Sequence, residues 1–173
     1  MADEVRETIE IDAPVQKVWD LVMDPHRLGE WVSTHQSVDN VPDGGLEQGS
    51  TFDQRMKLAG KGFDVTWTVR ECDAPNKAAW EGAGPGGSTA HVVYELREAG
   101  HGTRFDYANG FELPGGVLGR VAGKVATGKA AHSQARKTLA RLKELLEGPQ
   151  PAAPGEIQDA GVGMEDPGRG SRR

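Results

Sequence analysis

The apolar positions near the N-terminus recur at every second residue. Val5, Ile9 and Ile11 alternate with polar and charged side chains over residues 4–11. Alternation of this kind predicts a β-strand with one buried face.

Helical spacing replaces this alternation directly afterwards. The apolar stripe of the next segment consists of Val15, Val18, Trp19 and Val22. It predicts a short helix, with Asp12 as a candidate N-terminal cap and Pro14 tolerated in the first turn. Pro25 ends that helix, because proline disfavours helical geometry in the preceding residue, Asp24. Residues 26–31 then predict a second short helix.

Period two returns between about residue 34 and residue 112. The predicted strands are residues 34–41, 50–58, 62–73, 76–82, 88–98 and 103–112. The connecting segments are short and rich in Gly, Pro, Asn and Asp, which is typical of hairpins, and none is long enough for a crossover helix. The pattern therefore predicts a consecutive antiparallel meander.

Steps of three and four residues predict one long C-terminal helix that ends at Glu147. Its stripe is Leu118, Val121, Val125, Gly128, His132, Ala135, Leu139, Leu142 and Leu146. Such a helix has about 30 residues and a length of about 45 Å. After Gly148 the chain has Pro, Gly and scattered charge with few large apolar residues. We therefore expect one folded domain at residues 1–147 and a disordered tail at residues 148–173.

The alternation places most aromatic residues on one face of the sheet. The predicted inner face comprises Phe52, Gln54, Met56, Leu58, Phe63, Val65, Trp67, Val69, Ala78, Trp80, Ala90, Val92, Tyr94, Leu96, Phe105, Tyr107, Asn109 and Phe111. Trp19 and Trp31 lie instead in the two short helices. Only the long helix can cover this face, and its middle, around Gly128, His132 and Ala135, fills little volume. Close packing and a cavity both explain such a stripe. A glycine inside a helix costs about 1 kcal/mol relative to alanine. We take a cavity beneath the helix as the reason why Gly128 is present there.

Several short motifs have the residue types and the order along the chain that are typical of a known family. They are Ile11-Asp12-Ala13-Pro14, Val18-Trp19, Asp24-Pro25, Glu30-Trp31, Thr66-Trp67, Ala79-Trp80 and Leu139-x-x-Leu142-Lys143-x-Leu145. Over about residues 4–147 the chain resembles the START/polyketide-cyclase superfamily (SRPBCC proteins). The resemblance implies an α+β helix-grip fold: a curved antiparallel sheet of about seven strands around a long C-terminal helix, with two short helices between the first two strands. It also implies a deep pocket for a hydrophobic molecule. Members cyclise or aromatise polyketides or carry lipids or quinones, and the resemblance supplies no catalytic signature here.

Charge and composition exclude several other classes of function. The formal net charge is -6 with no Lys/Arg cluster, which argues against nucleic acid as a partner. The single cysteine, Cys72, excludes an internal disulfide. The N-terminus is charged where a signal peptide is apolar, and no apolar stretch reaches the roughly 18 residues of a membrane span. We expect a cytoplasmic protein that is a monomer or weak dimer.

Two features of the sequence argue against a bound cofactor or metal. Residues 82–87 match the dinucleotide fingerprint G-x-G-x-x-G, but an alternating strand follows where that chemistry requires a helix, so the glycines predict a hairpin loop. The five histidines form no pair at a metal-ligand spacing. We expect neither a cofactor nor a metal.

The candidate ligand-binding residues come from the inner face, the second short helix and the long helix. They are Trp31, Gln54, Met56, Trp67, Trp80, Tyr94, Phe105, Tyr107, Asn109, Phe111, Leu118, Val121, Val125, Gly128 and His132. The polar members either hydrogen-bond one another or orient a ligand. His132 is either a histidine at the core edge or a pocket residue that moves a proton near neutral pH, and it is the candidate catalytic base.

Three functions fit these residues. The first is non-catalytic binding of a hydrophobic small molecule that is polyketide-, lipid- or quinone-like. The second is an aromatase/cyclase that acts on a poly-β-ketone chain, with His132 as base and Tyr94, Tyr107 or Gln54 polarising a carbonyl. We expect no inner-face carboxylate as a substitute base. The third is an interaction or stress-response module whose cavity is unused.

Overall fold

The strands and helices follow the order that the sequence predicts. A computed structural model of the chain describes residues 4–58, 60–112 and 128–148. The strands are β1 (Glu4–Ile11), β2 (His35–Asp39), β3 (Thr51–Leu58), β4 (Lys61–Asp73), β5 (Lys77–Ala83), β6 (Thr89–Ala99) and β7 (Gly102–Glu112). The helices are α1 (Val15–Val22), η1 (Pro25–Arg27), α2 (Leu28–Trp31), η2 (Pro85–Gly87) and α4 (Lys129–Glu147). The predicted tail at residues 148–173 lies, apart from Gly148, outside the described residues.

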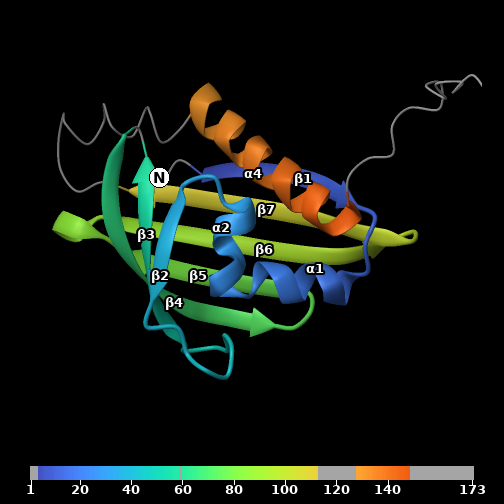
Figure 1. Ribbon diagram of the computed structural model, residues 1–173, viewed down its shortest axis with the longest axis horizontal. Helices are drawn as coiled ribbons and strands as arrows, with labels where there is room; N and C mark the ends of the chain where they lie inside the picture. Colours follow the sequence, from blue (N-terminus) through green and yellow to red (C-terminus); the bar gives the residue numbers. More distant parts are fainter. Residues whose placement is uncertain (1–3, 59, 113–127, 149–173) are drawn as a thin grey trace, which may run out of the picture.

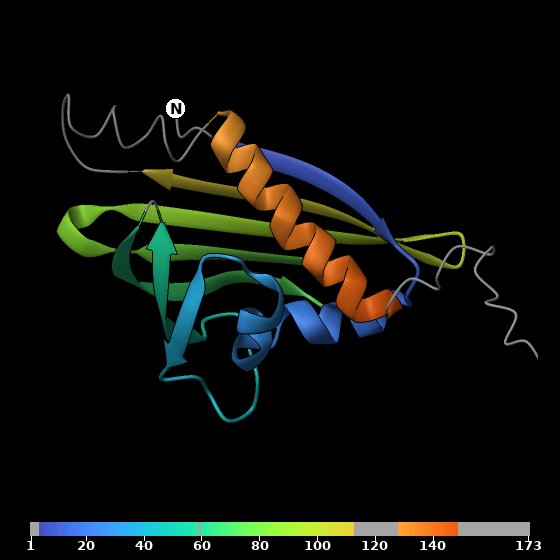
Figure 2. The same cartoon turned by 45° about the horizontal axis from the view of Figure 1, so that its top comes forward.

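All seven strands belong to one antiparallel sheet in the order β1-β7-β6-β5-β4-β3-β2. Strands β2 to β7 form the predicted meander, and β1 joins the far edge beside β7. Figure 1 shows the sheet curling towards α4, and in Figure 2 this helix crosses the sheet obliquely. Helices α1 and α2 lie on the same side as α4 (Figure 1). The predicted α+β helix-grip architecture is confirmed.

The strand register keeps the predicted inner-face residues together. Tyr94 pairs with Tyr107, and Phe105 lies opposite Leu96 on one side and Ile9 on the other. Every residue of the predicted inner face is buried or half-buried. The alternation in the sequence therefore identified the correct face, because a shift of one residue would have turned this whole set towards solvent.

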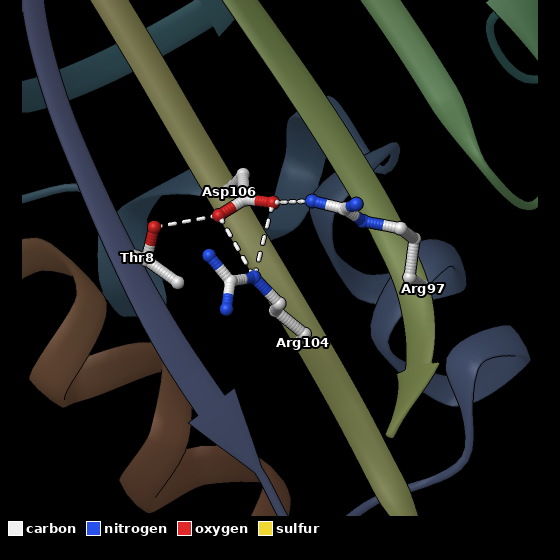
Figure 3. Close-up of polar contacts among 4 residues, drawn as sticks. All are labelled: Thr8, Arg97, Arg104 and Asp106. Atoms are coloured by element: carbon white, nitrogen blue, oxygen red, sulfur yellow. Dashed lines mark hydrogen bonds and ion pairs between the residues drawn. The ribbon is translucent and has the colours of Figure 1, made fainter.

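The opposite face of the sheet carries charged side chains. On it, Asp106 accepts hydrogen bonds from Thr8 Oγ1 at 2.5 Å, Arg97 Nη2 at 2.5 Å and Arg104 Nε at 3.3 Å (Figure 3). Partial burial tends to raise the pKa of Asp106, but these hydrogen bonds outweigh it and lower that pKa. The three donors thus hold an ionised carboxylate across β1, β6 and β7.

Helix α4 buries its C-terminal half against the sheet and the short helices. Its buried residues are Ala135, Thr138, Leu139, Leu142 and Leu146. The prediction of one unbroken helix through Gly128 is wrong, because this glycine has φ 84° and ψ -161° and precedes the helix as its N-cap. Glycine reaches positive φ at little cost, so backbone geometry explains this residue better than a cavity does. Among the described residues, no helix has the length and apolar character needed to cross a bilayer.

The start of α1 differs from the prediction. Pro14 is the N-cap, and no side chain caps the first turn. Asp12 lies two residues earlier, where its backbone N–H donates to Glu147 Oε1 at 2.7 Å. The prediction of Asp12 as the cap is therefore wrong, since this residue belongs to the connection that joins the end of β1 to the end of α4.

The glycine-rich segment at residues 82–87 is a hairpin connection, as predicted. Strand β5 ends at Ala83, the single turn η2 follows, and β6 begins at Thr89. Gly86 and Gly87 have positive φ angles of 66° and 82°. No α-helix begins after these glycines to receive a pyrophosphate group.

Candidate ligand-binding site

A cavity of about 310 Å³ lies between the sheet and the N-terminal half of α4. Strands β3, β4, β6 and β7 supply its floor, while α4, α2 and the segment after α2 supply its cover. The volume corresponds to about ten water molecules at about 30 Å³ each. It falls near the lower end of the range of about 300–1,000 Å³ for small-molecule sites. A hollow beneath α4 is therefore present, although Ala135 alone of the three residues that suggested it lines the cavity.

Seven predicted site residues line this cavity together. They are Gln54, Met56, Trp67, Tyr94, Tyr107, Asn109 and Phe111. They come from four different strands, and the inner face of the curled sheet brings them to one place. Phe63 also lines the cavity, and its ring centroid lies 5.4 Å from that of Phe111.

Three predicted aromatic residues pack beside this wall instead. The ring centroids of Trp80, Phe105 and Trp31 lie 5.2, 5.5 and 6.0 Å from that of Tyr94. None of the three is among the residues that line the cavity, and all are almost completely buried. Within the described part of the chain, the indole N–H groups of Trp31 and Trp80 have no hydrogen-bond partner. These rings pack around Tyr94 in the part of the core that the cavity does not reach.

The predicted helix residues are placed differently from the strand residues. Gly128 and His132 are described but do not line the cavity. Leu118, Val121 and Val125 lie outside the described residues. The turn of α4 that faces the cavity instead presents Ala130, Ala131, Gln134, Ala135 and Thr138.

Sequence reasoning missed the polar link between α4 and the end of α2. Gln134 Nε2 donates to Ser33 Oγ at 2.6 Å, and Thr138 Oγ1 lies 3.0 Å from the same oxygen. Gln134 and Thr138 line the cavity beside Leu28 and Val32. Residues 131, 134, 135 and 138 have helical spacing, so the sequence did contain a signal for this face of α4. The face is turned slightly away from the predicted stripe.

A hydrogen-bonded chain of three side chains crosses the β3 side of the cavity. Trp67 Nε1 donates to Gln54 Oε1 at 2.8 Å, and Gln54 Nε2 lies 2.9 Å from His35 Nδ1. The other side of the His35 ring lies against Gly29. A Cβ atom added to this glycine would lie 3.1 Å from His35 Cδ2. Burial lowers the pKa of His35, so the imidazole is held in its neutral form. Sequence reasoning assigned no role to His35.

Two tyrosine hydroxyls supply further polar groups. Asn109 Nδ2 donates to the hydroxyl oxygen of Tyr107 at 2.9 Å. Burial raises the pKa of Tyr107 to about 12 and that of Tyr94 well above its usual value. Both hydroxyls therefore keep their protons at neutral pH and are available as hydrogen-bond donors.

His132 belongs to a charged cluster at the seam between β1 and α4. Its Nδ1 lies 2.7 Å from Glu7 Oε1, and Arg136 Nε donates to the same oxygen at 3.2 Å. Burial tends to raise the pKa of Glu7, but the hydrogen bonds and charges of His132 and Arg136 together lower it. The expectation that no carboxylate lies on the inner face is wrong, because Glu7 shares the strand face of Val5 and Ile9. Its side chain is 15% exposed and is directed at α4.

The described lining of the cavity has no permanently charged side chain. It contains no Asp, Glu, Lys or Arg, and its ionisable groups are the two tyrosines and His91. Within residues 4–58, 60–112 and 128–148, no three His, Cys, Asp or Glu side chains are grouped as metal ligands. The arrangement can therefore enclose an uncharged apolar body and offer it a few hydrogen bonds.

Comparisons with known proteins agree with this architecture. The family model described as "Polyketide cyclase / dehydrase and lipid transport" matches residues 2–147. An uncharacterized protein of Mycobacterium tuberculosis is 29% identical over 136 residues, which cover 78% of this chain and 93% of that protein.

Two solved structures illustrate the shared fold. A START superfamily protein from Mycobacterium smegmatis superimposes with a TM-score of 0.67 at 14% identity, over 83% of this chain and 97% of that one. A putative protein in the dynemicin biosynthetic locus gives a TM-score of 0.58 at 21% identity, over 86% of this chain and 48% of that one. Since the family model matches most of the sequence, the chain belongs to the polyketide cyclase/dehydrase and lipid-transport family.

Proposed function

We propose that this protein binds a hydrophobic, ring-containing small molecule of polyketide-, quinone- or lipid-like character in the cavity beneath α4. The observation that carries the proposal is the cavity itself, which has a volume of about 310 Å³, an aromatic and aliphatic wall and no Asp, Glu, Lys or Arg in its described lining. Apolar surface that moves from water into such a space is stabilised by about 25 cal/mol per Å². The family description, which includes lipid transport, supports the same proposal.

Binding of a neutral fluorescent probe tests the proposal directly. N-phenylnaphthylamine emits strongly only in apolar surroundings, so titration into the protein reports an accessible cavity. Ala131 lines the cavity on α4, and a phenylalanine there fills part of it. We expect Ala131→Phe to weaken probe binding at least about tenfold, which corresponds to about 1.4 kcal/mol.

Ala140→Phe is the matched control for this experiment. Ala140 lies on the same helix but is exposed. The variant adds the same ring to the same element and should bind the probe as the wild type does. Equal probe binding by both variants, or none by the wild type, would refute the proposal and favour an interaction module whose cavity is unused.

The ligand class can be named by native mass spectrometry. Protein purified gently from its own source should carry mass above that of the chain alone, and the released compound should be apolar. A monomeric or weakly dimeric state and a cytoplasmic location remain our predictions, and the same spectra test the first.

Catalysis on a poly-β-ketone chain is the second candidate function. The hydrogen-bond donors beside the cavity favour it, because Gln54, Tyr94 and Tyr107 would polarise a carbonyl there. His132 is the proposed base, although it bonds Glu7 and its side chain is 42% exposed. Unchanged turnover of an identified substrate by His132→Ala would remove it from that role.

A further inference from the structure

The orientation of the Gln54 side chain is set by its two ring partners. An indole nitrogen can only donate a hydrogen bond, so the atom of Gln54 that faces Trp67 Nε1 at 2.8 Å must be the oxygen. The amide nitrogen must then face His35 Nδ1 at 2.9 Å. The hydrogen bonds from Trp67 to Gln54 and from Gln54 to His35 therefore run in one direction, which fixes where the Gln54 amide hydrogens lie.

This direction also fixes the protonation of His35. Because Gln54 Nε2 donates, His35 Nδ1 accepts, and the ring carries its single hydrogen on Nε2. The partial burial of His35, which lowers its pKa, favours the same uncharged form. One of the two Gln54 Nε2 hydrogens is thus committed to His35. In the described part of the chain, Nε2 makes no other hydrogen bond.

We infer that Gln54 is the residue that selects the ligand, by donating its second Nε2–H to a neutral oxygen acceptor such as a ring-bound carbonyl. The inference rests on the proposed function and names the ligand chemistry of the same cavity. Gln54 lines the cavity while being 3% exposed, so a ligand there competes with little water for this donor. An apolar ligand without the oxygen leaves the donor unpaired in a buried site.

The same lining disfavours an ionised ligand. No lysine or arginine of the described lining faces the cavity to neutralise a carboxylate. Tyr94 and Tyr107 offer neutral hydroxyls, and the ring of His91 already has a carboxylate partner in Glu4 at 3.0 Å. Transfer of a carboxylate from water into such surroundings is costly without a paired cation. The cavity therefore prefers a ketone or quinone to a fatty-acid-like or aryl carboxylate of the same size.

Three naphthalenes of matched shape separate these cases. Acetylnaphthalene carries a carbonyl, isopropenylnaphthalene replaces its oxygen by carbon, and naphthoate carries a charge. Each displaces N-phenylnaphthylamine from the intact protein in a fluorescence titration at neutral pH. We expect the ketone to bind about three- to tenfold more tightly than the alkene, the value of one buried hydrogen bond, and more tightly still than the carboxylate.

Substitution of Gln54 tests whether this residue is the source of the preference. Gln54→Met keeps a similar shape without the donor, and we expect the alkene and the ketone to bind it equally. Gln16→Met is the control, because Gln16 is exposed on α1 and bonds Asp20, so the ketone preference should survive. If Gln54→Met does not fold, Trp67→Phe replaces it. That variant keeps Gln54 but removes the hydrogen bond that holds its side-chain oxygen, so the ketone preference should shrink.

The outcomes distinguish the inference from the proposed function. Equal affinity of ketone and alkene in the wild type, or a ketone preference that survives in Gln54→Met or is undiminished in Trp67→Phe, overturns the inference while cavity binding stands. Naphthoate binding as tight as the ketone overturns the preference for neutral ligands. No displacement by any of the three, with no probe bound, overturns the proposed function and this inference with it.

Discussion

Removal of Gln54 should destabilise the fold as well as change ligand selection. In Gln54→Met the indole N–H of Trp67, a residue 3% exposed, loses its partner in a buried site. An orphaned buried donor costs about 1–3 kcal/mol. His35 Nδ1 loses its partner too, but this ring is only half-buried, so water compensates in part. We expect the free energy of unfolding to fall by about 2 kcal/mol.

A double-mutant cycle with Trp67→Phe isolates the hydrogen bond. Trp67→Phe alone orphans Gln54 Oε1 and also removes ring volume, so it is destabilising by itself. In the double variant neither group remains to be orphaned. The combined loss should therefore be smaller than the sum of the single losses by about 1–2 kcal/mol.

Urea denaturation followed by tryptophan fluorescence and circular dichroism measures all four corners of the cycle. The midpoint should shift without a change in the denaturant slope, which reports the surface exposed on unfolding. Gln16→Met, on the exposed face of α1, should stay within about 0.5 kcal/mol of the wild type. Additive single losses, or a loss below about 0.5 kcal/mol in Gln54→Met, would refute the reasoning.

Three further predictions concern stability. Burial lowers the pKa of His35 in the folded protein, so the unfolded chain binds more protons here, and the free energy of unfolding falls as pH drops below about 6.5. In urea titrations between about pH 7.5 and about pH 5.5, His35→Gln should remove this part of the pH dependence of the free energy of unfolding. An unchanged pH dependence in the variant would contradict the prediction. Because the pKa of Glu7 is lowered in the folded protein, its carboxylate contributes stability that is present above about pH 4.5 and is lost as pH falls through the folded pKa. Glu7→Gln should abolish that acid-dependent loss, as followed by thermal melts. Leu142→Ala, at a completely buried position of α4, should cost about 2–5 kcal/mol by urea denaturation. Leu145→Ala, where the leucine is 43% exposed, should cost under about 1 kcal/mol, and comparable losses would contradict the packing of this helix.

The sheet was predictable from the sequence because strand alternation leaves little freedom. Tyr94 and Tyr107 share a face in any register that also buries Leu96 and Phe105, so one pattern fixes many neighbours. The same reasoning brought Gln54 and Trp67 to the cavity wall. Short turns between strands then determined the meander without any knowledge of distant contacts.

The features that the sequence did not reveal depend on contacts between distant segments. His35 reaches Gln54 because the β2–β3 register shifts between His35 and Ser37, and alternation cannot show such an irregularity. Glu7 has inner-face parity, but its partners lie on α4, more than one hundred residues later in the chain. Gly128 stays within helical spacing although its φ angle is positive, because spacing carries no information about backbone angles.

The placement of β1 has a consequence for how the nascent chain folds. Glu4 pairs with Gly110 and Ile11 with Thr103, so β1, the first of the described strands to be made, bonds to β7, the last of them. At about 5–20 residues per second, the ribosome needs roughly 5–20 s to deliver β7 after β1. During that interval β1 has no partner strand, and its apolar side chains and unpaired backbone groups are open to chaperones and to other chains. The slow step in forming this fold should therefore be the joining of β1 to β7, a contact of high sequence separation, rather than the assembly of the local meander.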